Sequence, residues 1–181
     1  MTDSASDRRE PRPPSSAELI QSFEAAESCE TTRLLDGAWR LARQHLQQWA
    51  MEDQSRDQAA SDEAVAAAKH AIDQLNTVRV DLIAAIDMWA ATHLPSSPRS
   101  TPHTESLGFV IDRLAVAWVR KQRFVDRAAA SGTQDDGSLA SLAARQLEEL
   151  GCAYDHLIRD VRVGNRRLPN WLSLKRYGSR P

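Results

Sequence analysis

Residues 45–87 read HLQQWAMEDQSRDQAASDEAVAAAKHAIDQLNTVRVDLIAAID, and this stretch decides the fold because it holds two helical segments separated by a polar turn. In the first segment five residues recur at steps of three or four, which places them along one side of a helix: His45, Trp49, Glu52, Asp53 and Arg56. In the second segment polar residues fall within an apolar stripe that covers about one third of the helix circumference: Ile72, Asn76, Arg79, Ile83, Ile86, Asp87 and Ala90. A buried charge without a partner is destabilising, so we expect these polar groups to pair with each other or with a neighbouring helix.

Helix signals continue on both sides of this stretch. Upstream, Ser15 and Glu18 form a capping-box pattern that predicts a short N-terminal helix. The long helices are predicted over about 34–56, 61–92, 104–131 and 138–163, with Ser61 and Ser138 as caps and a proline-rich linker over 94–102. Four long amphipathic helices joined by short connections predict an all-α fold, an antiparallel bundle of four long helices plus a short N-terminal helix.

Composition limits the class of protein. The 181 residues suffice for one domain with a sizeable core, and the formal net charge of −2 argues against a general nucleic-acid binder. Two cysteines, Cys29 and Cys152, do not make a disulfide framework. No signal-peptide core is evident and no window approaches the roughly 20 apolar residues of a membrane span, so we expect a cytoplasmic protein without a membrane segment.

The two ends of the chain differ from the centre. Residues 1–15 contain three arginines and three prolines but no large apolar residue after Met1, which predicts a disordered tail before a single helical-bundle domain over 16–177 and a short C-terminal end over 178–181. From Arg159 onward seven basic residues accompany one acid, with Trp171 and Tyr177 among them. This segment can bind an anion or a nucleic-acid phosphate, or it can pack back on the bundle, and the sequence leaves both interpretations open.

Three groups of residues have the form of motifs: Trp49-x-x-Glu52-Asp53-x-x-Arg56 followed by Lys69-x-x-Ile72-Asp73-x-x-Asn76-x-x-Arg79-x-Asp81 and Ile86-Asp87; Thr104-Glu105-x-x-Gly108-x-x-Ile111-Asp112-Arg113-Leu114; and Leu174-Lys175-Arg176-Tyr177. Together they resemble the bacterial family named domain of unknown function 4254, over about residues 34–177. The chain departs from the family pattern at His45, where an asparagine is expected, and around Arg79. The resemblance implies an all-helical bacterial cytoplasmic protein, and the family name carries no activity.

The polar residues of these motifs are the candidate site. Glu52 and Asp53, with His45 nearly two turns earlier, are the predicted catalytic residues, because burial that raises the pKa of one carboxylate would supply a general acid and base. The predicted substrate-binding residues come from three helices: Trp49, Arg56, Asn76, Arg79, Asp87, Asp112 and Arg113. Three converging guanidinium groups would bind a carboxylate or phosphate through forked donors.

A structural interpretation of the same arginines competes with this one. Each can pair locally: Arg56 with Glu52 or Asp53, Arg79 with Asp87 or Asp53, and Arg113 with Asp112 or a loop carbonyl. Cys152 and His156 have metal-ligand spacing, but two ligands without a second pair do not predict a metal site, and no cofactor is assigned.

Two hypotheses follow from the sequence. The first is a small bacterial enzyme of specialised or glycoconjugate metabolism that acts on a small anionic substrate. The second is a non-catalytic interaction or adaptor protein that binds a protein partner and whose polar core only fixes the helix register.

Overall fold

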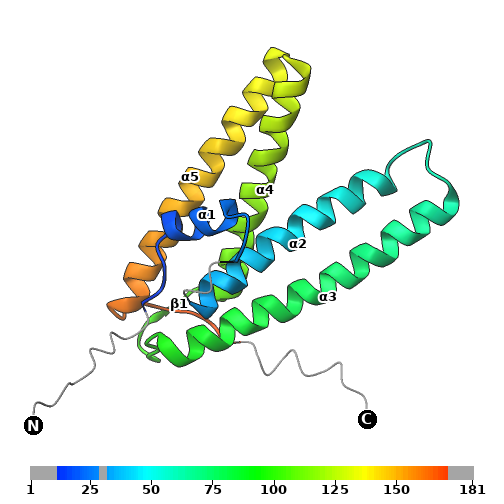
Figure 1. Ribbon diagram of the computed structural model, residues 1–181. Coiled ribbons are helices and arrows are strands. Elements are labelled where there is room, and N and C mark those ends of the chain that lie inside the picture. Colours follow the sequence, from blue (N-terminus) through cyan, green and yellow to red (C-terminus); the bar gives the residue numbers. More distant parts are fainter. Residues whose placement is uncertain (1–11, 29–31, 171–181) are drawn as a thin grey trace, which may run out of the picture.

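The computed structural model describes residues 12–28 and 32–170, which form two helical hairpins and a short N-terminal helix (Figure 1). The elements in chain order are α1 (Ser16–Glu24), α2 (Arg33–Ser55), α3 (Asp62–His93), β1 (Thr101–Pro102), α4 (Leu107–Ser131), α5 (Gln134–Arg162) and β2 (Arg166–Arg167). The predicted all-α fold is confirmed. The predictions for residues 1–11 and for the tail around Trp171 and Tyr177 lie outside the described residues.

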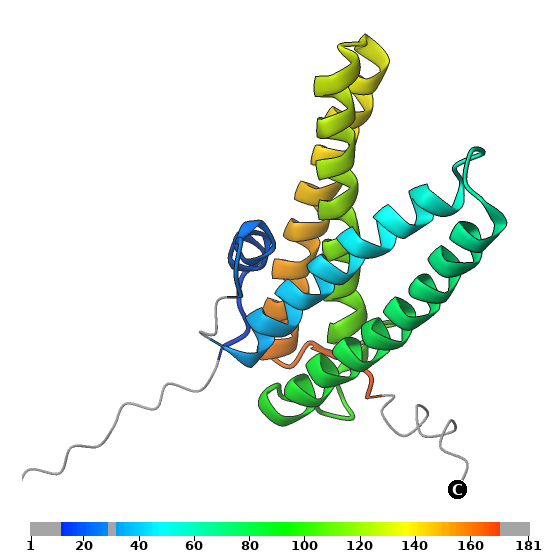
Figure 2. The ribbon, with the colours of Figure 1, turned by 45° about the vertical axis from the view of Figure 1, so that its right-hand side comes forward.

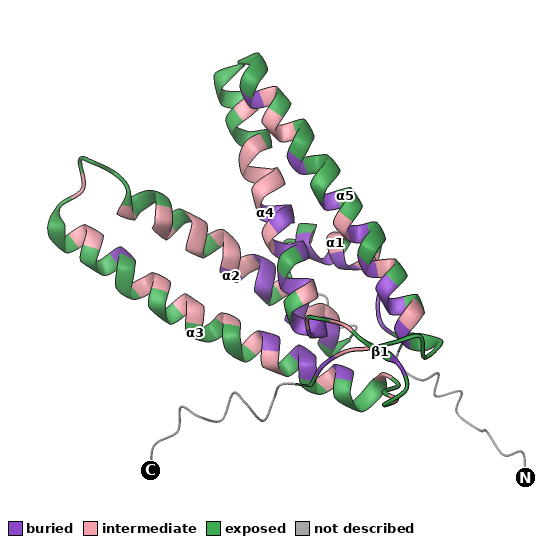
Figure 3. Ribbon diagram, turned by 180° about the vertical axis from the view of Figure 1, so that it is seen from behind, coloured by how far each residue is buried: buried purple, intermediate pink, exposed green. Residues whose placement is uncertain are grey.

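The two hairpins lie together at one end and diverge toward their turns (Figures 1 and 2). Helices α2 and α3 form the first hairpin, and α4 and α5 form the second. Helix α4 contacts α1, α2, α3 and α5, so the two hairpins meet through it. Buried residues gather where the hairpins meet, whereas the far ends are mostly exposed (Figure 3).

Local capping determines where the helices begin. The hydroxyls of Ser15, Thr32 and Ser61 each accept a backbone N–H from the first turn of α1, α2 and α3, as the sequence predicts for Ser15 and Ser61. The predicted cap at Ser138 is wrong. Thr133 caps α5, and the Ser138 hydroxyl instead donates to the Gln134 carbonyl inside the helix.

The predicted start of the preceding helix near Thr104 also needs correction. Helix α4 begins at Leu107 and ends at Ser131, and the Gly132 that follows has φ 63°, a backbone conformation that glycine adopts without strain. Its cap residue, Ser106, makes no side-chain capping bond because its hydroxyl donates to Asp87 of α3 at 2.8 Å.

The linker before α4 is tied to the end of α5. Strand β1 pairs with β2 in parallel, with Thr101 opposite Arg166 and Pro102 opposite Arg167. The Ser100 hydroxyl adds a 2.6 Å hydrogen bond to the Gly164 carbonyl. The linker over 94–102, predicted from its prolines, therefore contains a short strand that holds the loop before α4 against the C-terminal end of α5.

Helix α1 covers the junction of the hairpins. Its Phe23 ring lies 5.8 Å from the Trp118 ring of α4, centroid to centroid. Ser16 donates its backbone N–H and its hydroxyl to Asp155 of α5 at 2.8 and 2.6 Å, and the Tyr154 hydroxyl donates to the Pro14 carbonyl at 2.9 Å. These bonds fix the start of α1 on α5. Within residues 12–28 and 32–170, no helix is both long enough and apolar enough to cross a bilayer.

Helices α3 and α4 approach closely at Gly108. A Cβ atom at this position would lie 2.5 Å from the Ile83 carbonyl oxygen and 2.9 Å from Oδ1 of Asp87. The Gly108 N–H donates to the same Asp87 oxygen at 2.8 Å. Only glycine fits here, because the nearest obstacle is backbone and cannot rotate away.

We expect Gly108→Ala to lower the free energy of unfolding by about 1–3 kcal/mol, as other overpacked contacts do. The measurement is urea unfolding followed by circular dichroism. Gly137→Ala is the matched control: it lies inside α5 with no atom within 4 Å of a new Cβ, so it should be neutral or gain up to about 1 kcal/mol of helix propensity. Equal stability of the two variants would contradict this account of the helix contact.

The turn between α4 and α5 is held by an ion pair and hydrogen bonds to the Asp136 carboxylate. Its carboxylate accepts from Arg127, from the Ser131 hydroxyl at 2.6 Å and from the Thr133 hydroxyl at 3.0 Å. Arg127, and then Ser131, lowers the pKa of Asp136 from 3.8 to about 2.

A carboxylate whose pKa is lower in the folded state stabilises the fold above its unfolded pKa, and the stabilisation is lost as the pH falls through the folded pKa. For Asp136 the window runs from about pH 4 down to about pH 2. We expect the unfolding free energy of Asp136→Asn to fall less than that of the wild type across this window. Parallel curves for the two proteins in urea unfolding at several pH values would refute the prediction.

Candidate functional site

One buried carboxylate joins three helices. Asp112 of α4 is 2 % exposed. Its Oδ1 accepts from Nε of Arg79 on α3 at 2.8 Å, and its Oδ2 accepts from Nη2 of the same guanidinium at 2.5 Å. Nε2 of His45 on α2 lies 2.8 Å from Oδ1. A bidentate arginine and an imidazole therefore share one carboxylate.

The helix contact at Gly108 explains why these groups meet. Asp112 lies one turn after Gly108 on α4, and Arg79 lies one turn before Ile83 on α3. Because Gly108 lies against the backbone of Ile83, the next turn of each helix is also close. The contact brings the arginine to the carboxylate, and α2 adds His45 from the other side.

The electrostatics of Asp112 are set by opposing effects. Burial alone would raise its pKa, but the hydrogen bonds from Arg79 and His45, together with their charges, hold the pKa below the ordinary aspartate value. The same pair raises the pKa of Arg79, again against desolvation. Asp112 is therefore an anion at neutral pH, and it is not a candidate for the proton-carrying carboxylate.

A cavity of about 400 Å³ lies beside this cluster between α2, α3 and α4. Its lining combines an aromatic ring, apolar side chains and charged groups: His45, Gln48, Trp49, Glu52, Arg56, Arg79, Val116 and Val119. Glu52 and Arg56 form an i,i+4 ion pair of 2.8 Å at its edge. Nε2 of His45 is engaged by Asp112, and Nδ1 makes no hydrogen bond within the described part of the chain.

A second cavity, of about 520 Å³, lies on the other side of Arg79. Arg79 and Val116 line both cavities, and Arg113 and Arg120 line the second. Arg113 forms an ion pair with Glu105, and Arg120 donates to Gln146 of α5 at 3.0 Å. Arg79 is thus placed between two solvent-connected hollows, with its side chain 34 % exposed.

The structure brings most of the predicted residues together. His45, Trp49, Glu52, Arg56 and Arg79 line the first cavity. Asp112 and Arg113 line the second. The three arginines do not share one cavity, because Arg113 is separated from Arg56 by the Arg79–Asp112 pair.

Three predicted residues lie elsewhere. Asp53 is exposed and lines neither cavity, and Asn76 is half-buried on α3, one turn before Arg79, and lines neither. Asp87 is buried and accepts hydrogen bonds from Ser106 and Gly108, so its place is at the start of α4.

Two of the predicted local pairings are wrong. Arg79 pairs with Asp112 rather than with Asp87 or Asp53, and Arg113 pairs with Glu105 rather than with Asp112 or a loop carbonyl. Only Arg56 pairs as predicted, with Glu52 one turn earlier. Spacing within one helix identifies a partner on that helix, but it does not identify a partner on another helix.

Sequence reasoning missed Gln48, Val116 and Val119 as parts of the first cavity. The two valines follow Asp112 by four and seven residues, so helical spacing from that aspartate would have found them. No three His, Cys, Asp or Glu side chains are grouped as metal ligands within residues 12–28 and 32–170.

We expect Asp112→Asn to lower the free energy of unfolding by about 2–3 kcal/mol, less than a fully buried pair would lose because Arg79 is partly exposed. The amide keeps the shape of the side chain but removes its charge. Its NH2 group would also face the N–H donors of Arg79 and His45. Asp53→Asn on α2 is the control and should stay within about 0.5 kcal/mol of the wild type. Chemical unfolding of the three proteins makes the comparison, and an unchanged Asp112→Asn would show that the ion pair does not hold the helices.

The chain was compared with known proteins. A family profile described as "Protein of unknown function (DUF4254)" matches residues 37–170, which include every residue of the two cavities and of the Asp112 cluster. No significant match was found among curated proteins or among solved structures. Because this match covers well over half of the chain, the chain belongs to the DUF4254 family.

Proposed function

We propose that this protein is an enzyme that binds a small anionic substrate in the cavity beside Trp49 and moves a proton through His45. The observation that supports the proposal most is that Asp112 holds His45 through Nε2 at the wall of a 400 Å³ cavity. This volume falls in the range of small-molecule sites. The bacterial and cytoplasmic setting implied by the family resemblance belongs to the same proposal.

The Asp112–His45 pair favours one form of the imidazole. An ionised carboxylate accepts a hydrogen bond, so Nε2 carries the proton and Nδ1 is left as the basic nitrogen. A buried carboxylate that fixes the tautomer and orientation of a histidine is a recurring feature of general-base sites. Asp112 acts as a positioning residue in this proposal, and His45 acts on the substrate.

The anion would be held by arginine. Arg79 uses Nε and Nη2 for Asp112, which leaves Nη1 for a ligand, and Arg56 is exposed at the rim. Guanidinium groups bind carboxylates and phosphates through directed N–H donors. The Trp49 ring supplies an apolar wall for the body of the substrate. Glu52, rather than the exposed Asp53, is the carboxylate placed to contact the substrate or to exchange a proton with it.

The second hypothesis, a non-catalytic adaptor, is favoured by one observation. Both oxygens of Asp112 are satisfied within the chain, as expected of a polar core that only fixes helix register. The two functions differ in whether a small anion binds at the open side of Arg79.

A thermal-shift screen distinguishes the enzyme from the adaptor. The wild type is tested with inorganic phosphate, sugar phosphates, nucleotides and di- and tricarboxylates. A ligand present at 100 times its Kd should raise the melting temperature by about 5–10 °C in a chain of this size. Arg56→Gln and Arg79→Met should reduce that shift severely. Arg40→Gln breaks an equivalent i,i+4 ion pair with Asp36 outside the cavity and should keep the shift.

Any hit is then incubated with wild type and His45→Gln and followed by proton NMR in D2O. Conversion or hydrogen exchange of the ligand by the wild type, with binding but no reaction in His45→Gln, would support the enzyme. Absence of any ligand-dependent shift, or equal shifts in Arg56→Gln, Arg79→Met and wild type, would favour the adaptor.

A further inference from the structure

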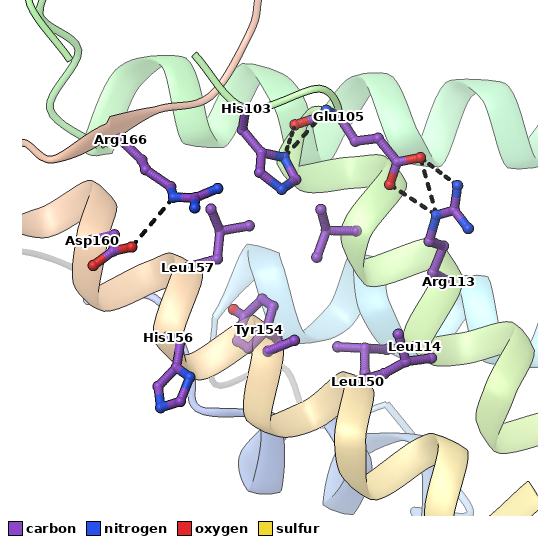
Figure 4. A pocket seen from close by; sticks show the side chains of 12 residues that line it. His103, Glu105, Arg113, Leu114, Leu150, Tyr154, His156, Leu157, Asp160 and Arg166 are labelled. Carbon is purple, nitrogen blue, oxygen red and sulfur yellow. Dashed lines mark hydrogen bonds and ion pairs between the residues drawn. The ribbon is translucent and has the colours of Figure 1, made fainter. Parts of the chain in front are cut away.

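A third cavity lies between α4, α5, the turn that precedes α4 and β2. Its volume is about 400 Å³. Arg113 lines it, but none of the residues that have a role in the proposed function does. Its floor is apolar and is formed by Leu114 of α4 and by Leu150, Tyr154 and Leu157 of α5 (Figure 4). Val110 of α4 also lines it. The Tyr154 hydroxyl is turned away to the Pro14 carbonyl, so the cavity meets only its ring.

Charged groups are confined to the rim of this cavity. Glu105 pairs with Arg113 at one side, and Asp160 pairs with Arg166 at the other. The apolar floor can hold the body of a ligand, and the rim can hold its charged end. The combination is typical of a site for an amphipathic small molecule.

Arg166 has unused donors that face the cavity. Its Nε forms an ion pair with Oδ2 of Asp160 at 3.3 Å, a long contact for a charged pair, and Nη1 and Nη2 make no hydrogen bond among the described residues. Figure 4 shows the guanidinium directed over Leu157 into the cavity. Pairing of β2 with β1 fixes the backbone of Arg166 beside the cavity. A planar carboxylate fits the two terminal nitrogens of a guanidinium end-on.

His103 lies beside Arg166 on the same side of the cavity, because it follows β1 and donates its backbone N–H to the Arg167 carbonyl of β2 at 2.9 Å. Its Nδ1 lies 3.2 Å from the backbone nitrogen of Glu105 and 3.0 Å from the Glu105 carbonyl oxygen. In the protonated ring Nδ1 donates to the Glu105 carbonyl and Nε2 is a second donor; in the neutral ring Nε2 carries the proton only when Nδ1 accepts from the Glu105 N–H. The imidazole points into the cavity (Figure 4). Arg166 and His103 thus both line the cavity beside its apolar residues.

We propose that this cavity binds a small carboxylic acid with an apolar body, whose carboxylate lies between Arg166 and His103 and whose body lies over Leu114, Leu150 and Leu157. The inference is independent of the proposed reaction at His45. The ligand is defined by its chemistry: one carboxylate at the end of a chain or ring without further charge.

The test is an NMR titration of the ¹⁵N-labelled full chain with octanoate. We expect shifts of the amides over 103–105 and 150–157 and none around Gln48 and Trp49. Octylamine, with the same body and the opposite charge, and inorganic phosphate, with the charge and no body, should bind at least about tenfold more weakly than octanoate.

Two variants and one control complete the experiment. Arg166→Gln should weaken octanoate binding by about tenfold or more, which corresponds to loss of one charged contact. Ala153→Phe, at an exposed position of α5 that lines the cavity, should block binding by filling the space. Arg145→Gln removes a charge from an exposed position of α5 outside the cavity and should bind as the wild type does.

Four outcomes would overturn the proposal: no shift at 103–105 and 150–157 with octanoate, equal binding by Arg166→Gln and wild type, equal binding by Ala153→Phe and wild type, or binding of octylamine as tight as that of octanoate. If Arg166→Gln disturbs the β1–β2 pairing, Ala153→Phe still decides, because it leaves that pairing untouched. Failure of this test leaves the thermal-shift result at the Trp49 cavity unaffected, so the two sites are judged separately.

Discussion

The arrangement of the two hairpins depends on a buried charge that cannot be left without a partner. Asp112 lies on α4, the helix through which the hairpins meet, and both of its oxygens are bonded to groups from the other hairpin. An isolated carboxylate at this depth would be strongly destabilising, so rotations of α4 that separate it from Arg79 and His45 are disfavoured. Apolar packing alone tolerates several rotations of a helix, and the carboxylate selects one of them.

A second buried carboxylate, Asp87, fixes the position of α4 along α3. Its oxygens accept from the Ser106 hydroxyl and the Gly108 N–H at the first turn of α4, where unpaired N–H groups and the helix dipole favour an anion. Asp87 therefore determines where α4 starts along α3, and Asp112 determines which side of α4 faces α2 and α3. The sequence predicted the same substrate-binding role for both residues, yet one caps a helix across a hairpin junction and the other binds an arginine and a histidine.

The features that the sequence predicted are the ones that depend on neighbours along the chain. Ser15 and Ser61 cap their helices as expected because capping involves only the next three residues. The error at Ser138 arose because Thr133 offers the same hydroxyl five residues earlier, and the choice between them follows from the contacts of Asp136 with Arg127 and Ser131. The partner of Arg79 was missed for a related reason: periodicity gives the face of a helix but not the rotation of the helix it meets. The presence of His45, Glu52 and Arg79 near one site was predictable, whereas the role of Asp112 as their common anchor required the tertiary contact at Gly108.

The divergence of the hairpins explains why charged groups and cavities occur together. Because α2 and α3 lean away from α5, side chains of α4 between them are covered incompletely, and three hollows follow one another around this helix. An ion pair lies at each boundary: Arg79 lines the first and second hollows, and Glu105 and Arg113 line the second and third. A closed four-helix bundle would have filled this space with apolar side chains and excluded water. In this open arrangement each arginine keeps part of its guanidinium in solvent, which lowers the cost of placing charge beside the core and leaves donors that a ligand can reach. The divergence of the hairpins therefore has two effects: it lets charged side chains lie beside the core, and it leaves them accessible to a ligand.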